Sequence, residues 1–240
     1  MRLYSNFPAN ALLVALESSG ASTMFVVMDA QAHWEMVYGS KASDAFSWFR
    51  PHLETSLALI ERVAPDHSIS LIDVGGGEST LVDDLLARGY QDIAVLDIST
   101  TALEATRRRL GSAGEHVRWL VDDITQAGPL PHDCDVWHDR AVFHFLTTKE
   151  QRDAYMEKVA SAVKPGGYVI ISTFAPTGPA RCSGLDVLRY DAQSLHAEFG
   201  ASFELVESFE ESHHTPFGTT LQFLYCCLRK NQFKAASRSS

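Results

Sequence analysis

A mostly apolar run that leads directly into three consecutive glycines constrains the fold of this chain most. Residues 70–74 have the composition of a buried strand, Gly75, Gly76 and Gly77 follow at once, and residues 80–88 have helical spacing. Because glycine lacks a Cβ and tolerates positive φ, a turn built from it lets backbone amides approach a ligand closely. A strand, a glycine turn and a helix in this order predict a nucleotide-cofactor site in an α/β protein.

The rest of the chain alternates between strand-like and helix-like segments. Further helices are expected over residues 49–63, 100–110 and 149–163, and further strands over residues 93–97, 117–121, 134–138 and 168–174. This alternation predicts an α/β fold with a doubly wound, mostly parallel sheet.

Two long strand-like runs end the chain. Residues 203–210 and 219–229 are separated by a short link that contains His213 and His214. Strands joined by so short a link pair antiparallel, so one of the two must run against the parallel strands. We expect the two histidines to lie in a solvated turn, and a place at the mouth of a substrate site is the alternative.

Length and charge narrow the range of partners. A chain of 240 residues fits one large domain better than two. The formal net charge is −10, and nucleic-acid affinity depends largely on Lys and Arg side chains that neutralise phosphates. No apolar stretch approaches the ~18–20 residues that a membrane span requires. We therefore expect neither a nucleic-acid nor a membrane partner, while the oligomeric state stays open.

The cysteines follow no metal-binding or disulfide pattern. Cys134, Cys182, Cys226 and Cys227 lack the paired spacing of a zinc site. We expect no metal site, and free thiols are consistent with a cytoplasmic location.

The two ends of the chain are expected to lie outside the folded domain. Residues 9–16 weakly imitate a signal peptide, but the flanking charges and the cleavage pattern do not fit one. We expect an N-terminal extension over residues 1–27 that is dispensable for folding, a domain over residues 28–230, and a flexible basic tail over residues 231–240.

Acidic residues end the second and third strands. Asp97 lies about 20 residues beyond the glycine turn, where a carboxylate accepts hydrogen bonds from the hydroxyls of a ribose. Asp122 and Asp123 place a carboxylate near an adenine amino group. Thr80 stands where a dinucleotide-binding fingerprint has its third glycine, which disfavours NAD. Asp97 by itself fits both NAD and S-adenosylmethionine, because the two cofactors share a ribose.

Four motifs in this order resemble the class I S-adenosylmethionine-dependent methyltransferases. They are the glycine segment 73–77, Asp97, Asp123 with Ile124, and the Lys-Pro-Gly-Gly turn at residues 164–167. The resemblance covers roughly residues 30–230. It implies a Rossmann-like seven-stranded sheet, mostly parallel with an antiparallel last strand, and S-adenosyl-L-methionine as the cofactor.

The same resemblance implies which residues bind the cofactor. Asp73 and the three glycines would hold its methionine part, Asp97 with Ile98 its ribose, and Asp123 with Ile124 its adenine. Two positions depart from the pattern. Ser79 stands where many members have another glycine, and Asp122 leaves open which carboxylate faces the adenine, with Asp123 preferred.

A finer resemblance concerns the segment before the first strand. Residues 33–38, with Phe46 and Trp48 after them, resemble the N-terminal segment of methyltransferase-like lysine methyltransferases. This implies that Trp34 and Tyr38 close over the cofactor, and aromatic packing under the sheet is the alternative. The fourth strand ends in a segment that resembles the Asp-Lys segment of these enzymes, with Arg140 in place of Lys.

Two residues after the fourth strand are candidates for proton transfer. Asp139 and His144 lie near the carboxyl end of that strand, where open α/β sheets bind ligands. A base is needed only if the acceptor atom arrives protonated. The alternatives are that Asp139 caps the following helix and that His144 is a core histidine. Asp139 is also expected to contact the cofactor.

The predicted function is S-adenosylmethionine-dependent methyl transfer to a nitrogen, oxygen or sulfur atom of a small molecule or of a protein side chain. Protein lysine methylation, a non-catalytic module that binds the cofactor, and an NAD-dependent oxidoreductase are the alternatives, in falling order. A loop rich in Pro and Gly over residues 174–184 has the length of a lid or substrate loop.

Overall fold

The computed structural model describes residues 11–16, 24–131 and 133–232. Most of the expected N-terminal extension and nearly all of the expected basic tail therefore lie outside the described residues. Among those described, no helix combines the length and the apolar character that a membrane crossing requires.

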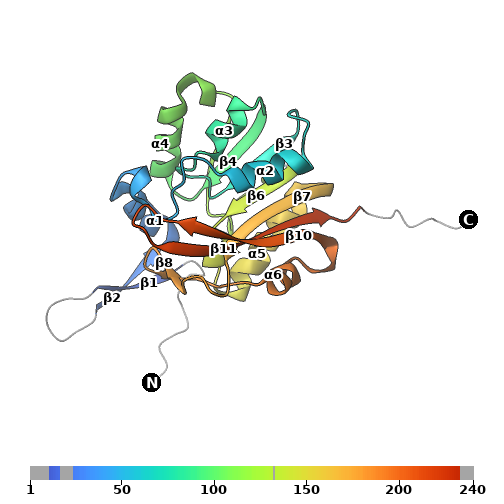
Figure 1. Ribbon diagram of the computed structural model, residues 1–240. Helices are drawn as coiled ribbons and strands as arrows, with labels where there is room; N and C mark the ends of the chain where they lie inside the picture. Colours follow the sequence, from blue (N-terminus) through green and yellow to red (C-terminus); the bar gives the residue numbers. More distant parts are fainter. Residues whose placement is uncertain (1–10, 17–23, 132, 233–240) are drawn as a thin grey trace, which may run out of the picture.

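A seven-stranded sheet forms the centre of the molecule, with the strand order β10-β11-β7-β6-β3-β4-β5 (Figure 1). Its strands are β3 (Ser70–Val74), β4 (Asp92–Asp97), β5 (Arg118–Val121), β6 (Cys134–Arg140), β7 (Val163–Phe174), β10 (Phe203–His214) and β11 (Thr220–Lys230). Strands β3 to β7 pair parallel, and β11 pairs antiparallel with both β7 and β10. The predicted mostly parallel sheet with an antiparallel last strand is confirmed.

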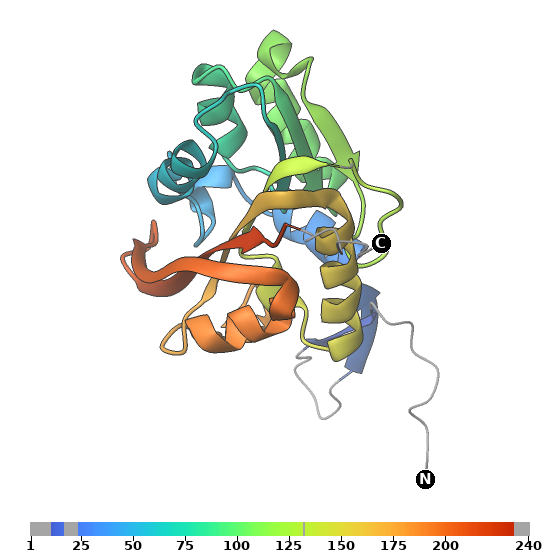
Figure 2. The same ribbon diagram turned by 90° about the vertical axis from the view of Figure 1, so that its right-hand side faces the viewer.

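Helices cover both faces of this sheet (Figures 1 and 2). Helices α2 (Glu54–Val63), α3 (Leu81–Ala87) and α4 (Thr100–Leu110) cover one face, and α5 (Lys149–Ala162) and α6 (Ala192–Phe199) cover the other. Successive strand residues point to opposite faces, so Leu71 packs with the first group of helices and Ile72 with the second. Because both faces are buried, parts of these strands, such as residues 93–96 and 168–171, are continuously apolar.

The order of the strands determines where a ligand site lies. From β3 the chain proceeds outward to β4 and β5, and it then returns to place β6 on the other side of β3. Val74 pairs with Leu96 on one side and with Asp139 on the other, so three strands end at the same edge. Open α/β sheets bind ligands at such a switch point, beyond the carboxyl ends of the strands.

An N-terminal hairpin and a helix precede the sheet. Strand β1 (Ala11–Leu16) pairs antiparallel with β2 (Met24–Asp29), and helix α1 (Ala30–Gly39) follows at once, with the Asp29 carboxylate accepting a hydrogen bond of 2.7 Å from the Ala32 amide. Strand β2 crosses the expected domain boundary between residues 27 and 28. Whether residues 1–27 are dispensable stays a prediction.

Several expected boundaries differ from the structure. Helix α2 begins at Glu54 rather than at residue 49, because Pro51 disfavours helical backbone in the residue before it. The expected loop over residues 174–184 includes strand β8 (Arg181–Cys182), which forms a small hairpin with β9 (Leu185–Asp186). The remaining short helices are η1 (Ser43–Ala45), η2 (Gly111–Gly114), η3 (Phe143–Phe145) and η4 (Gly200–Ser202).

The expected solvated turn at His213 is wrong. His213 and His214 both belong to β10, which runs four residues further than expected. His213 is fully buried, where its Nδ1 accepts a hydrogen bond of 2.9 Å from Arg50 and its Nε2 lies 2.7 Å from the Ser47 carbonyl oxygen. The histidine therefore ties the end of β10 to the segment before α2.

Candidate functional site

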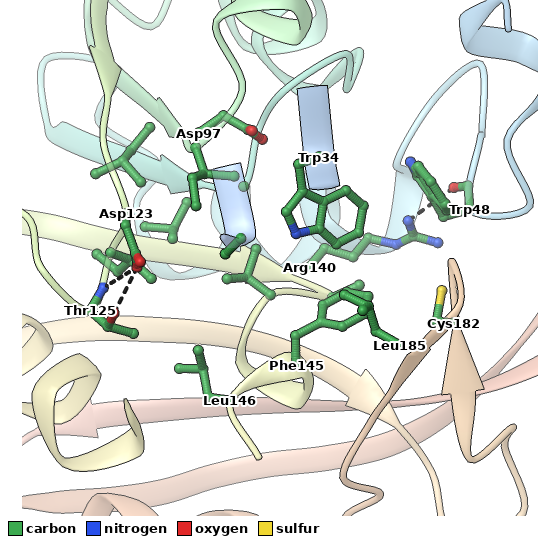
Figure 3. A pocket seen from close by; sticks show the side chains of 18 of the residues that line it. Trp34, Trp48, Asp97, Asp123, Thr125, Arg140, Phe145, Leu146, Cys182 and Leu185 are labelled. Carbon is green, nitrogen blue, oxygen red and sulfur yellow. Dashed lines mark hydrogen bonds between the residues drawn. The ribbon is translucent and has the colours of Figure 1, made fainter. Parts of the chain in front are cut away.

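A cavity lies at the carboxyl ends of β3, β4 and β6 (Figure 3). Helix α1, the η3 turn and the β8–β9 hairpin complete its walls. The residues that line it are Ala30, Trp34, Tyr38, Ser47, Trp48, Val74, Gly75, Leu96, Asp97, Ile98, Asp122, Asp123, Ile124, Thr125, Arg140, Ala141, Val142, Phe145, Leu146, Gln151, Phe174, Cys182, Leu185, Leu221 and Phe223. Seven of the predicted cofactor residues are thus brought together from distant parts of the sequence: Trp34, Tyr38, Gly75, Asp97, Ile98, Asp123 and Ile124.

The glycine turn at the end of β3 leaves no room for side chains. Gly75 and Gly77 have φ of 71° and 24°. A Cβ on Gly76 would lie 2.7 Å from an Asp73 carboxylate oxygen, and one on Gly77 would lie 2.7 Å from an Asp97 oxygen and 2.8 Å from the Tyr38 hydroxyl. These positions need glycine because three polar groups converge on the turn. Gly76 and Gly77 support the cavity without lining it.

The carboxylate of Asp97 lies at the end of β4 and faces the cavity. Its side chain is buried, and one of its oxygens accepts a hydrogen bond of 2.8 Å from the Ser99 amide. Burial raises the pKa of Asp97 to about 7, although hydrogen bonds from the Ser99 and Gly77 amides favour the charged form. A ligand that brings hydroxyl donors to this carboxylate would satisfy its charge.

Asp122, Asp123 and Ile124 follow β5 at the same end of the cavity. Asp123 accepts hydrogen bonds from the Thr125 amide and hydroxyl, at 2.9 and 2.7 Å, and from Gln126 at 3.0 Å. These bonds hold the turn after β5 in place. Asp122 accepts one hydrogen bond of 3.4 Å from the Gly128 amide. The preference for Asp123 over Asp122 as the adenine ligand stays a prediction.

Helix α1 carries Trp34 and Tyr38 across the cavity. The helix is held in place by Glu35, which accepts hydrogen bonds from the Thr100 and Thr101 amides, at 2.6 and 3.2 Å, at the start of α4. Burial raises the pKa of Glu35, but these bonds and those from nearby hydroxyls outweigh it and lower the pKa overall. Because a carboxylate is stabilised at a helix N-terminus, Glu35 fixes α1 beside Asp97.

The aromatic side chains of this region form one cluster. The Trp34 ring meets the Phe145 ring edge to face, with centroids 5.0 Å apart, and also contacts the Tyr38 and Trp48 rings. Trp48 is stacked on Phe46 at 4.6 Å. The two alternatives for Trp34 and Tyr38 are therefore not exclusive, because the same rings pack together and line the cavity.

Asp73 lies beneath the glycine turn in a buried polar chain. One of its oxygens is 2.7 Å from Nδ1 of His138, whose Nε2 is 2.9 Å from the Ser56 hydroxyl. Ser56 in turn lies 3.4 Å from the Tyr225 hydroxyl. All four side chains are buried. The chain links β3, β6, α2 and β11 directly behind the glycine turn, and Asp73 itself does not line the main cavity.

The two proton-transfer candidates lie behind the cavity wall. Asp139 is fully buried and accepts hydrogen bonds from the Val142 and Phe143 amides, at 2.9 and 3.2 Å, and from the Tyr155 hydroxyl at 2.6 Å. Burial raises the pKa of Asp139 to about 6. His144 is also fully buried, and burial lowers its pKa to about 3. Direct proton transfer from a ligand to either group would require the wall to open, so their roles as bases stay predictions.

Asp139 instead holds the turn between β6 and η3. The Ala141 backbone has a positive φ of 75°, and Val142 presses against Gly75. The capping alternative for Asp139 describes this geometry well, since the carboxylate accepts hydrogen bonds from the first amides of the η3 turn.

Several cavity residues were not predicted from the sequence. Phe145, Leu185 and Phe223 reach the cavity from η3, β9 and β11, whereas Cys182 lies in the segment 174–184 that was predicted as a lid or substrate loop. The sequence singled out Arg140 only as a substitution for Lys. Among the described residues that line the cavity, it is the one with a positively charged side chain. Its position at the end of a central strand was the signal that could have identified it. The structure also places no cluster of three or more metal-binding side chains among the residues it describes.

Comparisons with known proteins agree with this geometry. Residues 71–167 match a family model described as a methyltransferase domain. Over 147 residues the chain is 29% identical to the eEF1A lysine and N-terminal methyltransferase of Mus musculus, and this match covers 58% of the chain and 21% of that protein. The chain thus spans about a fifth of the length of that relative.

Two solved structures have the same fold. The N-methyltransferase NodS of Bradyrhizobium japonicum in complex with S-adenosyl-L-homocysteine has a TM-score of 0.64 at 14% identity, with 84% of this chain and 99% of that chain covered. The 1,6-didemethyltoxoflavin-N1-methyltransferase of Burkholderia thailandensis has a TM-score of 0.61 at 16% identity, with 95% and 99% covered.

Proposed function

We propose that this chain, which belongs to the class I S-adenosylmethionine-dependent methyltransferases, transfers a methyl group to an acceptor that enters the cavity beside Trp48. The observation that carries the proposal is the convergence of Asp97, the glycine turn and Trp34 on one cavity at the switch point of the sheet. The cofactor would bind at the end of the cavity that holds Asp97 and the glycine turn, and the acceptor would bind at the end beside Trp48.

The residues present fit S-adenosylmethionine. Asp97 is a buried carboxylate that can accept hydrogen bonds from the ribose hydroxyls, and Ile98 and Ile124 line the same cavity with apolar side chains. The glycine turn gives the close backbone approach that the methionine part requires. Trp34 and Tyr38 would cover the cofactor from α1.

The chemistry asks mainly for positioning. The bound cofactor supplies a methyl group on a sulfonium sulfur, so the acceptor's lone pair forms the new bond to the methyl carbon while the electrons of the broken carbon–sulfur bond remain on sulfur. The aromatic cluster excludes water and orients the acceptor, and well-oriented reactants gain much of the rate from proximity. A proton on the acceptor atom would leave to water at the mouth, since Asp139 and His144 are buried behind the wall.

A small-molecule acceptor is favoured over a protein side chain by the enclosed aromatic lining beside Trp48 and Phe145. Protein lysine methylation is the second candidate, because a relative matched over 58% of the chain is named an eEF1A lysine and N-terminal methyltransferase. The match covers only 21% of that relative, so its substrates are not carried over.

Two measurements test the proposal. Calorimetric titration should show binding of S-adenosylhomocysteine and none of NADH, and binding of NADH alone would revive the oxidoreductase alternative. Tritiated S-adenosylmethionine incubated with cell lysate and the protein should then label the small-molecule fraction. Label in the protein fraction would favour lysine methylation. If neither fraction carries more label than with an Asp97→Ala control, the alternative of a non-catalytic module that binds the cofactor would be favoured.

A further inference from the structure

The guanidinium of Arg140 lies at the end of the cavity opposite Asp97 and Asp123, the carboxylates expected to bind the cofactor. In Figure 3, Asp97 and Asp123 lie at one end, Trp34 and Phe145 lie between, and Arg140 extends towards Trp48 and Cys182 at the other end. The guanidinium carbon lies 4.7 Å from the centre of the Phe223 ring, and Nη1 donates a hydrogen bond of 3.1 Å to the Trp48 carbonyl oxygen.

Two of the three guanidinium nitrogens have no partner. Nε and Nη2 of Arg140 are buried, and no group among the described residues accepts a hydrogen bond from them. A buried cationic donor without an acceptor is costly, so such groups are normally paired. Arg50, the neighbouring arginine, differs in this respect because it bonds to His213, Glu54 and the Ser212 carbonyl oxygen.

The charges that line the cavity are segregated. Its carboxylates are Asp97, which ends β4, and Asp122 and Asp123, which follow β5, all at the cofactor end. The other end is lined by aromatic and aliphatic side chains, with Ser47 and Cys182 as small polar groups. No carboxylate among the lining residues reaches Arg140. This end is therefore suited to a flat apolar body and an anionic group.

We propose that Arg140 is the specificity residue for the acceptor, and that the acceptor is an aromatic or similarly apolar small molecule with a carboxylate or comparable anionic group. This rests on the proposed function, because it assigns this end of the cavity to the acceptor. The unpartnered Nε and Nη2 of the planar guanidinium form one two-donor edge for the anion, which is a geometry that Arg offers and Lys does not. The aromatic rings contact the body of the acceptor.

The same charge arrangement disfavours a lysine ammonium as acceptor. A cation placed beside Trp48 would meet the Arg140 guanidinium, and the carboxylates among the residues that line this cavity all lie at its other end. The face of the Phe223 ring, which would otherwise attract a cation, is already occupied by the guanidinium. The positive charge of Arg140 thus favours an anionic small molecule over a lysine side chain as the acceptor.

Benzoate, benzamide and benzylamine serve as matched probes, since they share a ring and differ in charge. Each is titrated by calorimetry into the protein saturated with S-adenosylhomocysteine. We expect benzoate to bind at least tenfold more tightly than benzamide, and benzylamine not to bind. Equal binding of benzoate and benzamide, or preferential binding of benzylamine, overturns the proposal using wild-type protein alone.

Variants assign the selectivity to Arg140. Arg140→Gln should abolish the preference for benzoate while the dissociation constant for S-adenosylhomocysteine changes less than threefold, and Arg140→Lys should keep only part of the preference. Arg108→Gln, on the exposed face of α4, is the control and should change neither. Circular dichroism verifies folding.

A loss of S-adenosylhomocysteine affinity above tenfold in Arg140→Gln would overturn the proposal, because the guanidinium would then serve the methionine carboxylate of the cofactor. Failure of wild-type protein to bind S-adenosylhomocysteine at all would instead contradict the proposed function.

Discussion

At the scale of the residue, Asp97 is a buried carboxylate that must be ionised to bind the ribose of the cofactor. Burial raises its pKa to about 7 in the unliganded protein, and the ionised form is the one that accepts hydrogen bonds from ribose hydroxyls. We therefore predict that the affinity for S-adenosylhomocysteine falls as the pH is lowered from 8 to 6, with proton release on binding below pH 7. Calorimetry in buffers of different ionisation enthalpy measures both effects.

Removal of the titrating group tests this assignment. Asp97→Asn should bind about 10- to 100-fold more weakly at pH 8, because a hydrogen bond to a charged group contributes about 1.5–3 kcal/mol, and its affinity should not depend on pH between 6 and 8. An unchanged pH dependence would assign the titration to another group. The free energy of unfolding of the unliganded protein depends on pH in the opposite direction from ligand affinity. Because the folded-state pKa is raised, the contribution of Asp97 to unliganded stability is present at low pH and is lost as the pH rises through about 7.

Gly77 is the residue at which a single methyl group should be least tolerated. Its φ is positive, and a Cβ would contact both Asp97 and Tyr38. We predict that Gly77→Ala destabilises the protein by about 1–3 kcal/mol and abolishes binding of S-adenosylhomocysteine. Thermal unfolding with and without this ligand measures both losses. Gly39→Ala is the matched control, because no atom lies within 4 Å of a Cβ at that position, and an equal loss there would contradict the steric explanation.

At the scale of the element, the turn from β6 into η3 depends on one carboxylate. Both Asp139 oxygens accept hydrogen bonds, and an amide group in their place would turn a donor towards either the backbone or Tyr155. We predict that Asp139→Asn lowers the free energy of unfolding by about 1–3 kcal/mol and slows turnover, because Val142 and Phe145 would shift.

The pH profile of turnover distinguishes this positioning role from acid–base catalysis. If Asp139 only holds the turn, Asp139→Asn should lower the rate by the same factor at every pH between 6 and 9. Loss of one limb of the profile would show that Asp139 accepts the proton from the acceptor. Tyr155→Phe removes one donor to the same carboxylate without altering the turn amides, and it should cause a smaller fall in rate.

At the scale of the whole molecule, the covered sheet and the N-terminal elements make different contributions. The sheet and its helices account for both core clusters, whereas α1 is attached at the edge of the cavity through Glu35 and the aromatic cluster. We predict that a variant starting at residue 28, which keeps Asp29 and α1, unfolds within about 3 °C of the full chain, equivalent to about 1 kcal/mol, and keeps its affinity for S-adenosylhomocysteine.

A variant that starts at residue 40 provides the comparison. It lacks Trp34, Glu35 and Tyr38, so it should remain folded and lose most of its affinity for the ligand. Unfolding of the first variant at room temperature would contradict the expectation that residues 1–27 are dispensable.

Most of the fold followed from local patterns in the sequence. Apolar strands buried on both faces, glycines that end helices and a short link before the last strand are properties of neighbouring residues, so the sheet and its antiparallel last strand could be predicted. Asp97 and Gly75 were identified for the same reason, because each ends a strand at the ligand edge of such a sheet.

Tertiary structure decided which of these residues reach the ligand. The spacing of residues along the sequence does not reveal burial or long-range hydrogen bonds. The sequence therefore could not show that His213 is buried against Arg50 or that Asp139 faces the backbone instead of the cavity. The sequence by itself determined the sheet and the place of the glycine turn, because both depend on local backbone chemistry. The folded chain determined the charge at the acceptor end, because only there do Arg140, Trp48 and Phe223 meet.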